Sequence, residues 1–128
     1  MEATDFLRAC RLRIWEGTYS VSQVHAIPPN FVAAIRGQRE MTVVHRTDTL
    51  PAQLIRREEK GWKIITFDVE LPFELTGFLA AITEMLAQRK VPVFALSAFS
   101  TDHLLIREAH LEAGLRALAE LGCLPEQA

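Results

Sequence analysis

The fold is decided by residues 71–107, which read LPFELTGFLAAITEMLAQRKVPVFALSAFSTDHLLIR. In the first part, apolar residues recur at the three- and four-residue spacing of an amphipathic helix, which predicts a helix over 75–90. Residues 91–99 are apolar except for one serine and carry a proline near their start, which is typical of a strand. Turn residues at 100–102 and alternation over 103–107 predict a second strand, antiparallel to the first.

The residues on either side extend this pattern. Alternating apolar residues predict a strand over 62–69, and a leucine stripe followed by Gly122 predicts a helix over 109–121. The order βαββα is one strand short of the ferredoxin-like βαββαβ sandwich, an α+β fold. We expect the strand over 10–14 to fill the empty place, so that the two halves of the chain interlock. The larger core should then contain Ile65, Phe67, Leu79, Ile82, Leu86, Phe94, Leu96, Ile106, Leu111, Leu115 and Leu118.

The N-terminal half has weaker signals. Alternation predicts strands over 10–14, 18–27 and 41–46 and a short strand over 52–55. Residues 28–30, Pro-Pro-Asn, can open a short helix over 31–36, and residues 124–128 are expected to be a tail. The charge run RREEKG at 56–61 has two interpretations, a nucleic-acid patch or a solvated link, and its nearly cancelling charges favour the link. This predicts an N-terminal unit over 1–61 and a C-terminal unit over 62–128.

Composition excludes several classes of protein. The chain has 128 residues, 49% of them hydrophobic, with a net charge of −2, which gives no electrostatic case for nucleic acid. No apolar run approaches the roughly 20 residues of a membrane span, and the first residues lack a signal sequence. Cys10 and Cys123 form neither a disulfide framework nor a metal motif. We expect a cytoplasmic protein without nucleic-acid or membrane partners, and a homodimer because a small domain cannot bury so much apolar surface.

The start of the central helix offers a binding site. Gly77 would allow close backbone approach, and the N–H groups of Gly77, Phe78 and Leu79 would point out of the helix start, where the dipole favours a carboxylate. Asp102 ends the turn after the strand over 91–99. Its carboxylate would bind the ammonium group of the same ligand. Two plainer interpretations stay open: Gly77 as a tight turn with nothing bound, and Asp102 as an ordinary turn residue that caps its own backbone.

The segments ELTGFLAAI (74–82), VFALS (93–97) and STDHLLI (100–106) resemble an ACT domain, more narrowly the CASTOR-type and aspartate-kinase-like branch in which two units occur in tandem. Thr76 stands where the family commonly has proline, and Arg89-Lys90 where a glycine commonly ends the helix. The resemblance implies a non-catalytic regulatory module that senses an amino acid or related carboxylate at an interface between ACT units. The implied ligand-binding residues are Glu74, Leu75, Thr76, Gly77, Phe78, Leu79, Ala98, Phe99, Ser100, Thr101 and Asp102.

Two alternatives to a sensor stay open: a ligand-free ACT scaffold that mediates self-association or docking on an enzyme, and an enzyme on a ferredoxin-like sheet. No residue pattern indicates a catalytic site, a metal site or a cofactor. His25 and His45 lack a third metal ligand. No nucleophile or base motif accompanies Asp68, Glu70 and Glu74. We interpret these three residues as a solvated acidic rim. His103 either lines the site beside Asp102 or faces solvent.

Overall fold

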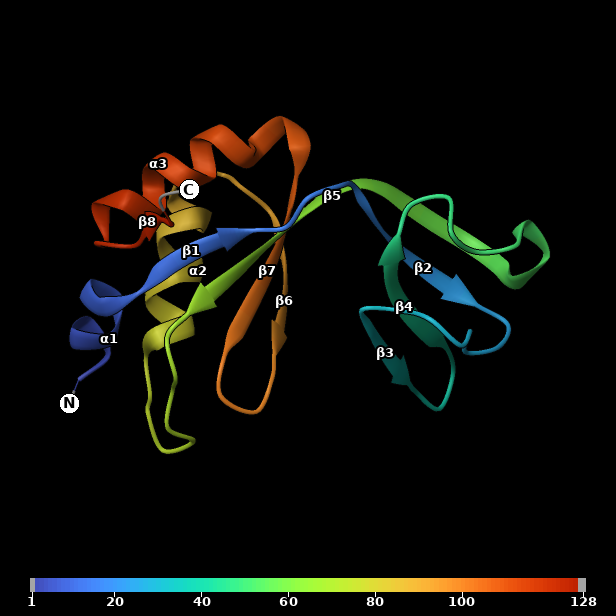
Figure 1. Ribbon diagram of the computed structural model, residues 1–128, viewed down its shortest axis with the longest axis horizontal. Coiled ribbons are helices and arrows are strands. Elements are labelled where there is room, and N and C mark those ends of the chain that lie inside the picture. Colours follow the sequence, from blue (N-terminus) through green and yellow to red (C-terminus); the bar gives the residue numbers. More distant parts are fainter. Residues whose placement is uncertain (1, 127–128) are drawn as a thin grey trace. The chain divides into compact units, whose positions relative to one another are not determined.

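One long strand connects the two compact units of the protein. The computed structural model describes residues 2–126, and β5 (Ile55–Asp68) runs through both units (Figure 1). The described residues up to Trp15 and those from Lys63 onward form the first unit, and Glu16–Trp62 form the second. The charge run over 56–61 therefore lies within a strand, and the prediction of a link there is wrong. Its backbone pairs with β2 (Tyr19–Val24) while most of its side chains stay exposed.

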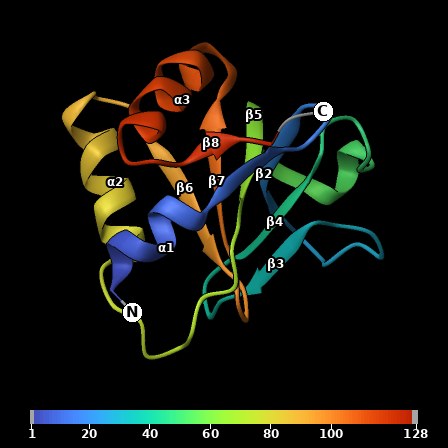
Figure 2. The same ribbon diagram turned by 60° about the vertical axis from the view of Figure 1, so that its left-hand side comes forward.

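The first unit is an α+β sandwich with helices on one face of its sheet. The strand order is β6 (Val93–Ser97), β7 (Asp102–Arg107), the second half of β5, β1 (Arg11–Ile14) and β8 (Leu124–Pro125). Helices α2 (Phe78–Gln88) and α3 (Leu111–Glu120) cover the same face, with the 3-10 turn η2 (Glu108–His110) leading into α3 (Figure 2). The helix–strand–strand order predicted from residues 71–107 is confirmed.

Strand β1 fills the place that the βαββα pattern leaves empty. It pairs antiparallel with β5, with Leu12 opposite Phe67 and Ile14 opposite Ile65. The interlocking of the two halves through the N-terminal strand is therefore confirmed. The prediction of a tail over 124–128 is wrong for Leu124–Pro125, because β8 pairs parallel with β1, and residues 127–128 lie outside the described part of the chain. A strand of only two residues is too short for a sequence pattern to reveal it.

The N-terminal helix α1 (Ala3–Ala9) was not expected from the sequence. Its start is held by a capping box, in which the Glu2 N–H donates to the Asp5 carboxylate over 2.8 Å. Leu7 belongs to the buried core of the first unit, and Phe6 packs against that core. At seven residues, the helix is too short for apolar spacing to reveal it and depends on this packing.

The end of α2 shows how the chain manages without the glycine that the ACT pattern commonly has there. Lys90 itself adopts the left-handed conformation, with φ of 59°. Its N–H donates to Ala87 O, and the Val91 N–H donates to Leu86 O, which is the Schellman arrangement. Val91 and Leu86 both lie in the core, so packing stabilises this strained helix end.

The second unit is an antiparallel sheet in the order β3 (Ala33–Arg36), β4 (Met41–Arg46), β2 and the first half of β5. The predicted helix over 31–36 is wrong, because β3 pairs with β4, which satisfies the backbone of so short a segment. The expected strand over 52–55 is instead the 3-10 helix η1 (Ala52–Leu54). Within Glu16–Trp62, which the structure describes completely, there is no α-helix.

His45 has a structural role in the second unit. It is 1% exposed, and Ser22 Oγ lies 2.7 Å from its Nε2 while Arg46 O lies 2.9 Å from its Nδ1. Both ring nitrogens are thus engaged by groups of the same sheet. His45 is thus held within the β2–β4 pair, where it lies opposite Ser20. No group of three or more potential metal ligands occurs among residues 2–126.

Candidate functional site

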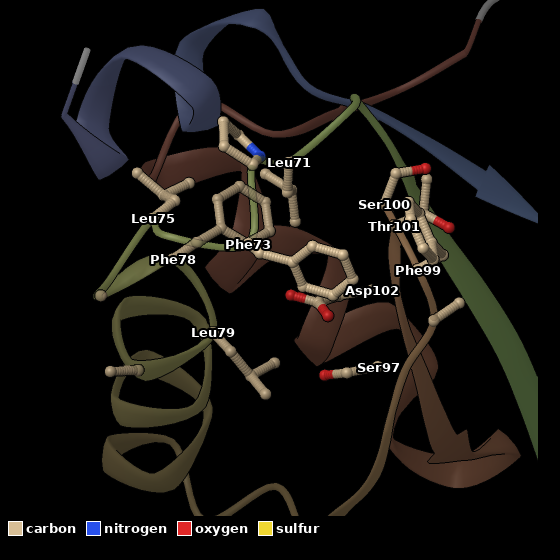
Figure 3. A pocket seen from close by; sticks show the side chains of 14 residues that line it. Leu71, Phe73, Leu75, Phe78, Leu79, Ser97, Phe99, Ser100, Thr101 and Asp102 are labelled. Carbon is tan, nitrogen blue, oxygen red and sulfur yellow. The ribbon is translucent and has the colours of Figure 1, made fainter.

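A cavity of about 370 Å³ opens beside the start of α2. Three segments of the first unit surround it: the loop after β5, the first turn of α2, and the end of β6 with the turn into β7 (Figure 3). The loop and the turn are tied together by the Leu71 N–H, which donates to Ser100 O over 2.7 Å. Inside the turn, the Ala98 N–H donates to Thr101 O over 2.9 Å. These backbone hydrogen bonds therefore hold the loop and the turn that form two walls of the cavity.

The structure brings nine of the eleven expected ligand-binding residues to this cavity: Leu75, Gly77, Phe78, Leu79, Ala98, Phe99, Ser100, Thr101 and Asp102. Glu74 and Thr76 instead line a neighbouring cavity of about 440 Å³, together with Leu75 and residues of the N-terminal helix such as Ala3. The cavity wall also contains residues that the sequence did not indicate: Leu71, Pro72, Phe73, Ala80 and Ser97. Ser97 could have been found from strand register, since it pairs directly with Asp102.

The first turn of α2 presents free backbone donors. Gly77 is the N-cap residue, and no side chain caps the helix. The first intrahelical hydrogen bond runs from the Ala81 N–H to Gly77 O over 3.0 Å, so the N–H groups of residues 78–80 precede it. These residues line the cavity. Backbone donors and the positive end of the helix dipole together form a site suited to a carboxylate.

Gly77 is required by the backbone conformation. Its φ is 87°, in the left-handed region that residues with a side chain rarely adopt. A β carbon at this position would meet the Ala3 Cβ at 3.7 Å, an ordinary contact. A substitution would therefore strain the turn whether or not it changed access to the cavity. The tight turn, one of the two interpretations of Gly77, is thus present in the structure.

Asp102 supplies the negative charge of the site. The residue is only 8% exposed, and its carboxylate points into the cavity near the Ser97 hydroxyl (Figure 3). Within residues 2–126, no hydrogen bond or ion pair to this carboxylate occurs, and no other charged side chain lines the cavity. The carboxylate oxygens are therefore available to a ligand in the cavity. The capping of its own backbone, expected of an ordinary turn aspartate, is not found.

The remaining walls are largely apolar. Leu71, Leu75 and Leu79 contribute aliphatic side chains. Phe73 and Phe99 are 71% and 80% exposed, and their rings meet edge to face with centroids 4.7 Å apart. Two large aromatic side chains thus remain at the surface where the loop and the turn approach one another. They form an exposed apolar rim to the cavity.

His103 does not line this cavity, because successive side chains of a strand point to opposite faces of the sheet. Its Nδ1 lies 2.8 Å from Thr66 Oγ1, which accepts a hydrogen bond from Trp15 Nε1 over 2.7 Å. Its Nε2 lies 3.3 Å from Thr101 Oγ1. Burial lowers the pKa of His103 below its usual 6.5, and the nearby Asp102 charge partly opposes this shift.

We expect His103 to make stability depend on pH. In the unfolded chain His103 binds a proton near pH 6.5, whereas in the folded protein it binds one only at a lower pH. The free energy of unfolding is therefore highest above about pH 6.5 and decreases as the pH falls through this range. Urea unfolding at several pH values between roughly 7 and 5 measures the slope. His103→Gln, which retains a hydrogen-bond acceptor for Thr66, should have the shallower slope. Equal slopes in both proteins would contradict the assignment to His103.

Comparison with known proteins identifies the family. The sequence matches the model of the ACT domain over residues 57–120, half of the chain. The chain therefore belongs to the ACT-domain family. No match was found among curated proteins.

Three solved structures show how much of the chain shares this architecture. The protein Atu0741 from Agobacterium tumefaciens is 29% identical, with a TM-score of 0.80 and 93% of this chain and 95% of that chain covered. The ligand-free regulatory subunit of aspartate kinase from Thermus thermophilus is 10% identical, with a TM-score of 0.63 over 86% and 95%. Escherichia coli aspartokinase III, solved with aspartate and ADP, is 10% identical, with a TM-score of 0.67 over 86% and 32%.

The likeness to the two aspartate kinase structures establishes only the fold of this chain, because both are 10% identical to it. Both superpose on 86% of this chain, which therefore shares the fold of their matched regions. Separately, none of the described helices has the length and apolar character needed to cross a membrane.

Proposed function

We propose that the protein is a non-catalytic regulatory module that binds a free amino acid in the cavity beside α2. The observation that carries this proposal is the pairing of opposite polarities across one cavity: backbone N–H groups at the start of α2 and the Asp102 carboxylate. The α-carboxylate would accept hydrogen bonds from residues 78–80, and the α-ammonium would pair with Asp102.

The walls favour a ligand with a neutral, apolar side chain. Asp102 is the only charged residue among those that line the cavity, and it is engaged by the ammonium group in this arrangement. Glu74, which would be the acid available for a guanidinium, lines the neighbouring cavity. Arginine would therefore lack a partner for its side chain. Leu71, Leu79 and the aromatic rim offer apolar contact, and roughly 300 Å³ or more is the usual size of a small-ligand site.

Aspartokinase III, with which this chain shares its fold, has been solved with aspartate and ADP, which supports an amino acid as the ligand class. The division into ACT-like units over 1–61 and 62–128 stays a prediction. Assembly as a homodimer is also proposed, because the exposed rim of Phe73 and Phe99 would gain from burial against a second chain.

A thermal-shift screen of the twenty amino acids tests the proposed function. A ligand that binds only the folded protein stabilises it by RT ln(1 + L/Kd), where L is the free ligand concentration, and so raises Tm as this concentration increases. We expect a shift with one or a few amino acids that have neutral, apolar side chains and no shift with their amides or decarboxylated amines. No response to any free amino acid would contradict the proposal.

A further inference from the structure

The two cysteines of the chain, near its opposite ends, lie side by side in the core of the first unit. Arg11 pairs with Leu124 in the parallel ladder between β1 and β8, so the residues just before them, Cys10 and Cys123, are also neighbours. Both are 0% exposed and belong to the same buried cluster. Neighbouring strands run about 4.8 Å apart. This spacing falls in the roughly 4.4–6.8 Å range of Cα separations that a disulfide bridges.

A shared hydrogen-bond acceptor supports this proximity. Leu7 O, at the end of α1, accepts from the Cys10 N–H over 3.4 Å and from Cys123 Sγ over 3.6 Å. Cys10 Sγ in turn donates to Arg11 O over 3.7 Å. Interaction with the neighbouring Cys123 thiol, together with burial, raises the pKa of Cys10, whereas interaction with Cys10 lowers the pKa of Cys123. The two thiols are thus neighbours whose pKa values shift in opposite directions.

We propose that Cys10 and Cys123 are a redox pair, which a low-molecular-weight disulfide converts into an intramolecular disulfide that joins the N-terminal segment to the end of α3. The Cys123 thiolate attacks one sulfur of the reagent, whose S–S bond breaks and releases one thiol. The Cys10 thiolate then attacks the Cys123 sulfur of this mixed disulfide and releases the second thiol. Two electrons pass to the reagent, and the two protons of the cysteines leave on its thiols.

Access to the buried pair comes through β8. This strand has only two residues, and Leu124 is 47% exposed. Beyond it, the Glu126 N–H donates to Leu12 O over 2.8 Å, and the Glu126 carboxylate pairs with Arg13 at the surface. So few contacts make β8 a low-stability element that opens locally, which exposes Cys123 before Cys10. In the reduced state β8 opens and closes, whereas the disulfide would hold it against β1.

The experiment uses the full chain in buffers of reduced and oxidised glutathione. After acid quenching and alkylation of free thiols, mass spectrometry of proteolytic fragments should show a Cys10–Cys123 link within single chains. The link closes a loop of more than about 100 residues, so the oxidised protein should unfold at a Tm roughly 10 °C higher. Hydrogen exchange of the β8 amides should slow in the same sample.

Two variants serve as controls, Cys10→Ala and Cys123→Ala. Cys10→Ala should form a mixed disulfide with glutathione at Cys123, because the attacking thiol is retained, and should show no rise in Tm. Cys123→Ala should react slowly, since local opening of β8 exposes position 123 before Cys10, and Cys10 stays buried. Should either variant fold poorly, the wild-type Tm with and without reductant still decides the point. A link between separate chains only, or an internal link that leaves Tm and β8 exchange unchanged, would overturn the proposal.

Discussion

Asp102→Ala is expected to weaken amino-acid binding by about tenfold to a hundredfold. The substitution removes a charge-assisted hydrogen bond from the ligand's ammonium group, which is worth roughly 1.5–3 kcal/mol. The carboxylate makes no hydrogen bond or ion pair among residues 2–126, so its removal breaks no side-chain interaction of the free protein. Stability without ligand should therefore be nearly unchanged. Calorimetric titration with the amino acid that gives the largest thermal shift measures the loss.

Glu74→Gln provides the matched control. It removes an acidic charge from the same loop, but Glu74 lines the neighbouring cavity instead of this one. Its affinity should stay within about twofold of the wild type, since a single exposed charge at this distance is screened by solvent and salt. Equal weakening by both variants would indicate general electrostatic attraction. Equal affinity in all three proteins would mean that the ligand binds elsewhere.

Gly77 is a less suitable position for such a test, although the sequence indicates it most directly. With φ of 87°, any side chain there strains the turn, and a branched one most of all. A loss of binding by Gly77→Val would therefore combine an altered site with a distorted helix start. Asp102 separates the two effects because its backbone is part of a regular strand pair with Ser97.

The sequence predicted the architecture of the first unit well because its patterns are long. Helix α2 has apolar residues over three turns, and the strands on either side of it have clear composition. Six of the residues expected in the core are fully buried: Ile65, Phe67, Ile82, Leu86, Ile106 and Leu118. Phe94 and Leu96 are wrong as core residues, because both lie on the edge strand β6 and pair with Leu105 and His103 on the other face of the sheet.

Short segments escaped prediction for a common reason: their conformation depends on partners distant in sequence. Residues 33–36 form a strand only because β4 is available to pair with them. Strand β8 exists only beside β1, on the opposite end of the chain. The same limitation applied to the site, where the cavity wall includes Leu71 and Phe73 from a loop whose path is set by a hydrogen bond to Ser100. Local propensity does not carry such information.

Leu12→Ala is expected to lower the free energy of unfolding of the first unit by about 2–5 kcal/mol. Leu12 is 1% exposed, faces Phe67 across the β1–β5 ladder and belongs to the main buried cluster. Truncation leaves a cavity that the surrounding sheet and helices only partly fill. Since domains of this size are stable by roughly 5–15 kcal/mol, the variant should lose a large fraction of its stability.

Ile14→Ala is the control for this prediction, because it lies two residues along the same strand and on the same face but is 36% exposed. Its truncation should cost less than about half as much, as less apolar area returns to water. Urea unfolding monitored by hydrogen exchange compares the two, with the β5 amides after Lys63 reporting on the first unit. If the first unit were stable without β1, both variants would lower its free energy of unfolding by equal and small amounts. The large difference is expected because an N-terminal strand completes a core formed otherwise by the last half of the chain.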